Sequence, residues 1–375
     1  MMPFKQYVSK IFFVCILSVS ILKVVSADNI SLEEDITDDG YLNTYTKIEA
    51  AFILSGLSDS DSLQKYLRWY DDLIAKIKTF DFDISNRVES AQTVFLYLHT
   101  TWLKTYALES TTLVDIARKK EFNCVAATIL FNIICEDLGW ECEAFETPTH
   151  VYTVFINFNQ RVLVENTSSL GFDIMKNLKD YSKYLARYYP ENMALRIGLD
   201  RLYYYENSKG RTINNTELLG LLAYNRAYLA KDKKDYKTVY KLVLLAQLFN
   251  SDSRSNVNFE IGLYYAWGRQ LVDQQKFKDA FGVFADGYYR YPDNEDFKQN
   301  TMASFFNSMQ VFWKDKNWKD TAQLMEEIIV LKLLTDKDRK NLQQLFLSWQ
   351  NYFKIIADED SAVETADYLQ KLSGN

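Results

Sequence analysis

Apolar residues recur every three to four positions along most of the chain, which is the spacing of amphipathic helices. In the N-terminal third this spacing predicts helices at 45–56, 62–79, 84–107 and 111–119. Further along, the pattern is harder to interpret and predicts a helix at 174–187, a break at Pro190 and an aromatic strand at 201–205. Most of the chain is therefore expected to be helical.

The stretch between Asn123 and Thr167 combines a helix with strands. Asn123 is a good N-cap residue, and Gly139 occupies the position of a helix C-terminal glycine. Between them, helical spacing predicts an amphipathic helix with one face formed by Cys124, Ala127, Thr128, Phe131, Cys135 and Leu138.

Two strands are predicted after this helix. The runs from His150 to Ile156 and from Arg161 to Glu165 are rich in β-branched and aromatic residues. If residues 158–159 form a two-residue turn, the numbers of opposed residues sum to 317. Glu165 then shares a sheet face with His150, whereas Asn166 points to the other face. A register shifted by one residue would exchange the two roles.

Cys124, His150 and Glu165 are the candidate catalytic residues. A thiol in the first turn of a helix lies at the positive end of the helix dipole, which favours the nucleophilic thiolate. A single cysteine in a helix is more often a buried apolar residue, and a single histidine in a strand is more often structural. The chain has two histidines, and we interpret the other, His99, as structural or exposed.

The same residues resemble the transglutaminase-like branch of the papain-like cysteine enzymes. The similarity rests on a Cys at a helix start, followed by His and an acid on adjoining strands fifteen residues apart. Bacterial proteins of this branch that also carry tetratricopeptide-like repeats share three motifs, here Asn123-Cys124-Val125, Pro148-Thr149-His150-Val151-Tyr152 and Val164-Glu165-Asn166-Thr167. Glu165 departs from the Asp that is usual in the wider family. The resemblance covers residues 85–175 and implies a Cys-His-Glu triad.

The C-terminal part contains an internal repeat. Its aromatic anchors Tyr236, Phe277 and Trp318 are 41 residues apart, and a weaker copy includes Asp360-Ser361-Ala362. Each anchor lies between two amphipathic helices, as in tetratricopeptide repeats. Because those repeats have about 34 residues, the helices or linkers here must be longer. Such an array presents a surface that binds a partner or only supports the neighbouring domain.

Composition and the N-terminus add three expectations. The formal net charge is −7 and no basic stripe is present, which argues against nucleic-acid binding. Residues 1–27 combine a basic start, an apolar run and a small-residue ending, as in a cleaved secretory signal; an uncleaved anchor is the alternative. Cys135 and Cys142 are expected to be buried thiols, although an oxidising compartment could link them.

The predicted organisation is a signal peptide at 1–27, an acidic arm at 28–44, an α+β transglutaminase-like catalytic domain at 45–210 and all-α tetratricopeptide-like repeats at 211–375. The resemblance implies an exported cysteine hydrolase, periplasmic or secreted, that cleaves peptide or isopeptide bonds. Its expected partners are a protein or peptide substrate and a protein bound by the repeats. No cofactor, metal or stable membrane span is expected. The alternatives are a cross-linking acyl transferase and a catalytically inactive scaffold.

Overall fold

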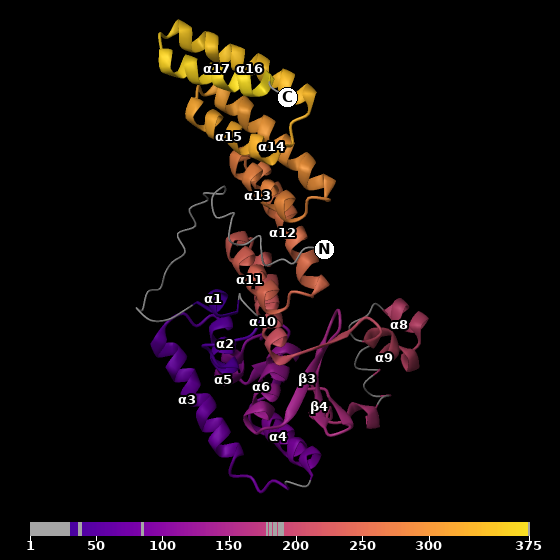
Figure 1. The fold of residues 1–375 in the computed structure, drawn as a ribbon. Helices are drawn as coiled ribbons and strands as arrows, with labels where there is room; N and C mark the ends of the chain where they lie inside the picture. Colours follow the sequence, from indigo (N-terminus) through magenta and orange to yellow (C-terminus); the bar gives the residue numbers. More distant parts are fainter. Residues whose placement is uncertain are drawn as a thin grey trace. The chain divides into compact units, whose positions relative to one another are not determined.

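A computed structural model describes residues 31–36, 40–83, 86–177, 179, 182, 186 and 191–373. Over these residues the protein is mostly helical and has two small sheets (Figure 1). It divides into two compact units, 23–260 and 261–375, with the division inside helix α12 (Arg254–Asp273). The signal peptide predicted at residues 1–27 lies outside the described residues. None of the helices in the described ranges has the length and apolar character needed to cross a membrane.

The predicted N-terminal helices are present. They are α2 (Lys47–Leu54), α3 (Ser60–Ile77), α4 (Arg87–Thr101) and α5 (Leu113–Lys119). Side chains cap their first turns, as Thr46 and Glu49 do reciprocally for α2. Helix α4 ends earlier than predicted, because the chain then enters β1 (Thr105–Tyr106), which pairs in parallel with β2 (Glu121–Phe122).

Part of the predicted acidic arm is packed against the first unit. Helix α1 (Leu32–Ile36) buries Leu32 and Ile36 in the hydrophobic core. Its Asp35 carboxylate accepts hydrogen bonds from the backbone N–H groups of Asn43 and Thr44 at 3.1 and 2.7 Å. The described part of 28–44 is therefore held by core contacts and by this carboxylate.

Helix α6 (Cys124–Asp137) begins and ends where the sequence predicts. The Asn123 side chain accepts a hydrogen bond from the N–H of Ala126 at 3.1 Å. At the other end Gly139 has φ 74°, and the N–H of Trp140 donates to the carbonyl of Cys135 at 2.9 Å. This is the glycine-terminated cap that left-handed geometry favours.

The prediction that α6 is amphipathic was wrong. Every residue from Cys124 to Cys135 is buried. Strands β3 (Glu141–Glu146) and β4 (Val151–Asn157) pack on one side of the helix, and α2, α5 and α10 (Asn215–Asp232) pack on the others. A helix surrounded in this way needs no polar face.

The main sheet is antiparallel, in the order β5–β4–β3–β6, with β5 at Gln160–Val164 and β6 at Arg211–Ile213. The predicted register is confirmed: Thr153 pairs with Val164, and Asn157 pairs with Gln160. Phe158, in the two-residue turn, has φ 52° and is exposed. His150 and Glu165 thus flank the ends of β4 and β5.

The strand predicted at 201–205 was wrong, because these residues lie in α9 (Leu199–Asn207). The aromatic run Tyr203-Tyr204-Tyr205 favours a strand locally, but β6 occupies the available edge of β3. Helix α8 (Glu191–Ile197) precedes α9. Of the helix predicted at 174–187, Ile174–Asn177 forms a short 3-10 helix, and most of the remainder lies outside the described residues.

The first unit extends beyond the predicted boundary at 211. Helices α10 and α11 (Tyr236–Phe249) contribute Leu218, Leu219, Leu222, Ala246 and Phe249 to the same core as α6. The first helical pair of the repeat therefore completes the first unit.

Helical pairs continue to the C-terminus. They are α12 with α13 (Phe277–Arg290), α14 (Glu295–Lys314) with α15 (Trp318–Leu331), and α16 (Asp336–Ile355) with α17 (Glu359–Ser373). The anchors Tyr236, Phe277 and Trp318 each begin the second helix of a pair, as predicted. In these three pairs the first helix has 20 residues, which explains the long period.

The turn inside each pair also repeats. Lys234, Gln275, Lys316 and Ala357 all have positive φ, between 54° and 59°. The next residue donates its backbone N–H to a carbonyl five positions earlier, as from Asn317 to Phe312 at 2.8 Å. These residues close the preceding helix in the left-handed conformation that glycine usually provides.

Candidate active site

Three chain segments bring the predicted residues together. Cys124 is the first residue of α6, His150 immediately precedes β4, and Glu165 immediately follows β5. The Nε2 atom of His150 lies 2.6 Å from Oε2 of Glu165. The two side chains are 1% and 2% exposed. The predicted pairing of His150 with Glu165 is therefore present in the structure.

The Cys124 thiol adjoins the same imidazole, close enough for its charge to act on the ring. Asn123 satisfies the N–H of Ala126 with its side chain and the N–H of Ala127 with its carbonyl. The backbone N–H groups of Cys124 and Val125 lie at the very start of α6. The first N–H groups of a helix have no carbonyl partner within that helix.

Burial and charge act in opposite directions on the His150–Glu165 pair. Burial alone would lower the pKa of His150, but the charges of Glu165 and Cys124, with the hydrogen bond to Glu165, hold this pKa well above its usual value. Burial alone would raise the pKa of Glu165, but His150 and Thr167 keep this pKa below its usual value. The arrangement favours imidazolium beside carboxylate.

Thr167 and Gly171, which were not among the predicted site residues, hold Glu165 in place. Thr167 donates to Oε1 of Glu165 through its N–H at 2.9 Å and its hydroxyl at 2.5 Å. The N–H of Glu165 donates to the carbonyl of Gly171 at 2.9 Å. A Cβ at residue 171 would lie 2.0 Å from the backbone oxygen of Glu165. Thr167 is the last residue of the Val-Glu-x-Thr motif, so the sequence did indicate a role for it.

We expect Gly171→Ala to displace Glu165 and to reduce the reactivity of the Cys124 thiol. Gly282 in α13 is the matched control, because a Cβ there meets no atom within 4 Å. In a helix interior, Gly→Ala should stabilise by about 0.5–1 kcal/mol. Thermal unfolding and iodoacetamide labelling would compare the variants. Wild-type behaviour of Gly171→Ala in both assays would contradict the close approach.

Asn166, the alternative partner of His150, points to the other side of the strand. Its amide nitrogen donates to the hydroxyls of Thr153 at 2.8 Å and Thr128 at 3.2 Å. The Thr153 hydroxyl donates in turn to Asn132 on α6, and Asn132 donates to Asn215 on α10 at 2.7 Å. This buried network connects the sheet to α6 and α10. Because Asn166 is bonded within it, Glu165 is the residue that pairs with His150.

The other described cysteines have a different environment. Cys135 and Cys142 are buried and free, in agreement with the expected pair of thiols. Burial raises the pKa of Cys135, with a further contribution from hydrogen bonding to Cys142. The Cys142 thiol donates to the carbonyl of Asn132 at 3.4 Å. Cys124, unlike these two, adjoins an imidazole.

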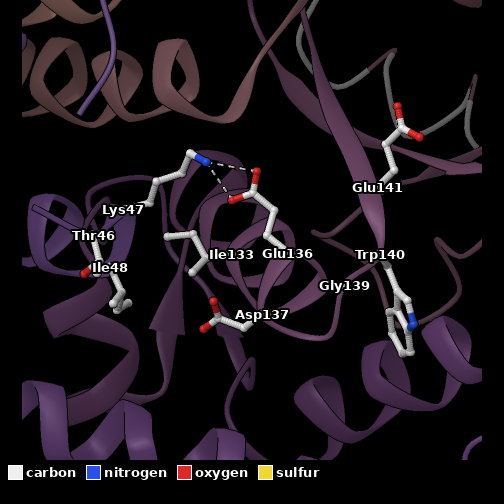
Figure 2. A pocket seen from close by; sticks show the side chains of 9 residues that line it. All are labelled: Thr46, Lys47, Ile48, Ile133, Glu136, Asp137, Gly139, Trp140 and Glu141. Atoms are coloured by element: carbon white, nitrogen blue, oxygen red, sulfur yellow. Dashed lines mark hydrogen bonds and ion pairs between the residues drawn. The ribbon is translucent and has the colours of Figure 1, made fainter. Parts of the chain in front are cut away.

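A surface pocket of about 510 Å³ lies at the C-terminal end of α6, whereas Cys124 is at the N-terminal end of this helix (Figure 2). In Figure 2, Lys47 reaches across the pocket to Glu136, and Nζ lies 3.0 Å from a carboxylate oxygen. This pocket does not include the triad. Within the described ranges, no group of three or more His, Cys, Asp or Glu side chains could hold a metal ion.

Comparison with known proteins assigns no family to this chain. No protein-family model matches the sequence, and no curated protein matches it. Among solved structures, a crystal structure of menin, which reveals the binding site for Mixed Lineage Leukemia protein, is similar over 91% of this chain and 94% of that chain. The two are 11% identical and superpose with a TM-score of 0.29.

Proposed function

We propose that the protein is a transglutaminase-like cysteine hydrolase that cleaves a peptide or isopeptide amide bond. The observation that carries the proposal is the buried 2.6 Å contact between His150 and Glu165, with Cys124 close to the same imidazole. A nucleophile, a base beside it and a third group that orients the base form the arrangement that activates a thiol.

The reaction would proceed in two steps. The Cys124 thiolate attacks the amide carbonyl, and the backbone N–H of Cys124 stabilises the oxyanion. The His150 imidazolium gives its proton to the leaving amine as the C–N bond breaks and a thioester forms. Neutral His150 then takes a proton from water, which attacks the thioester and releases the acid and the thiolate. Glu165 stabilises the imidazolium in the first step.

An amine that replaced water in the second step would form a new amide, as in a cross-linking acyl transferase. No feature of the described site selects an amine, so hydrolysis is preferred. The C-terminal helical pairs are proposed to be tetratricopeptide-like repeats that bind a protein partner or the substrate. Export as a periplasmic or secreted protein remains part of the proposal. A non-catalytic scaffold is the alternative from another class.

Mass spectrometry can test the proposal with a mixture of peptides and branched isopeptides, incubated with and without putrescine. We expect hydrolysis products and a peptide thioester on Cys124, both absent in Cys124→Ala. Products that contain putrescine would instead favour the transferase. Equal turnover by Cys124→Ala would exclude Cys124 as the nucleophile.

A further inference from the structure

The turn between α14 and α15 holds a lysine ammonium among three aromatic rings. Nζ of Lys316 lies 3.3 Å from the ring centroid of Trp313, in the last turn of α14. It also lies 4.9 Å from the centroid of Tyr352 and 5.7 Å from that of Trp349, both on α16. A cation within about 6 Å of a ring centroid is attracted by the ring. We refer to Trp313, Trp349 and Tyr352 as the aromatic cage.

The rings of the aromatic cage pack against one another at steep angles. The centroids of Trp313 and Trp349 are 4.9 Å apart with an interplanar angle of 82°, and those of Trp349 and Tyr352 are 5.9 Å apart at 80°. Trp349 is fully buried, whereas Trp313 and Tyr352 are half-buried and Lys316 is exposed. Buried Trp349 therefore anchors the cage, and the other two rings keep surface that a ligand can reach from solvent.

The backbone of the turn does not require these rings. In the preceding pair, the residues 41 positions before the cage are not aromatic: they are Val272, Ser308 and Val311. Gln275, the counterpart of Lys316, still has φ 59° against 54°, and the same backbone hydrogen bond closes the helix. The repeat can therefore form this turn without a cage, which leaves the cation-binding surface to be explained.

The indole N–H of Trp349 favours cation binding over packing alone. Among the described residues, this buried Nε1–H has no hydrogen-bond partner. A buried donor without a partner destabilises a fold, and phenylalanine would fill the space without one. Tryptophan, however, is the side chain whose ring attracts a cation most strongly.

We propose that the aromatic cage is a binding site for an alkylated ammonium group, as in a methylated lysine side chain or choline, and that Lys316 occupies it in the free protein. A primary ammonium is compact and strongly hydrated. Aromatic cages characteristically bind quaternary ammonium groups, so such a ligand can displace Lys316. The inference rests on the proposed function only where that function assigns partner binding to the repeats, and it is independent of the hydrolase chemistry.

Four variants of the full-length protein separate the cage from the turn. Lys316→Gly empties the cage and preserves the turn, because glycine adopts positive φ freely. Lys332→Gly is the matched control, at φ 55° in the C-cap of α15 and outside the cage. Trp313→Val and Tyr352→Val each remove one ring and introduce the residue found 41 positions earlier.

Isothermal titration calorimetry would measure the binding of choline and, separately, of a short peptide that contains trimethyl-lysine. We expect both probes to bind Lys316→Gly about two- to fivefold more tightly than wild type or Lys332→Gly, because the competing ammonium is absent. Trp313→Val and Tyr352→Val should each weaken binding about fivefold or more. Tighter binding of the peptide would identify a protein as the source of the ligand, and equal binding would identify a small cation.

Absence of binding of either probe to Lys316→Gly would overturn the proposal, as would binding that the ring variants retain. The two ring variants alter different helices, so one that melts cooperatively is sufficient for the comparison. An unreactive Cys124 would reject the hydrolase and leave these titrations unchanged.

Discussion

Glu165→Gln is expected to lower turnover by about three to four orders of magnitude while the protein still folds. The carboxylate is 2% exposed and 2.6 Å from Nε2 of His150, so it opposes the imidazolium charge without much screening by water. A neutral amide of the same shape can orient the ring but cannot stabilise its charge. The rate of thioester formation on Cys124, followed by mass spectrometry, would measure the loss.

Asn166→Ala is the matched control, one residue away on the opposite face. It leaves the hydroxyls of Thr128 and Thr153 without an amide donor, which should cost about 1–3 kcal/mol of folding stability. Below its melting temperature the variant should keep most of its turnover. A loss of turnover in Asn166→Ala that exceeded the loss in Glu165→Gln would contradict the assignment of the acid.

A chain of residues 31–210 is expected to lack a cooperative unfolding transition, whereas 31–260 should have one. Helix α10 buries Leu218, Leu219 and Leu222 in the core that contains α6. Exposure of each leucine costs about 1.5–3 kcal/mol. The stability of a whole domain is only about 5–15 kcal/mol, so their combined loss is large.

Hydrogen bonds of Asn215 on α10 support the same expectation. The Asn215 amide donates to Glu136 at 2.8 Å and to the carbonyl of Cys142 at 3.0 Å. In the shorter chain, Glu136, the Cys142 carbonyl and Asn132 would lose their hydrogen bonds to Asn215. Thermal melts followed by near-UV circular dichroism would compare the two chains. A sharp melt of 31–210 at the temperature of 31–260 would show that α10 and α11 are dispensable for this core.

The features that the sequence predicted best are set by local chemistry. Asn123 and Gly139 limit α6 because a cap requires only neighbouring backbone groups. The hairpin register follows from a two-residue turn and side-chain alternation. The position of Glu165 beside His150 could therefore be predicted from the sequence. The 41-residue spacing likewise located the second helix of each pair.

The errors concern contacts between distant segments. The burial of α6 from Cys124 to Cys135 depends on α2, α5 and α10, which occupy the side expected to face water. The packing of α10 in the core of the first unit, across the boundary predicted at 211, was not anticipated either. The requirement for glycine at residue 171 comes from the backbone of Glu165, and no local pattern reveals such a contact.

The alkylation rate of Cys124 at pH 6 tests the central proposal most directly. Intact protein would react with iodoacetamide, and mass spectrometry would follow peptides that contain Cys124, Cys135 and Cys142. A thiolate paired with His150 predicts that Cys124 reacts faster than free cysteine and that His150→Ala removes the difference. Burial alone would make all three thiols slower than free cysteine. A Cys124 rate at or below that of free cysteine would contradict the cysteine hydrolase.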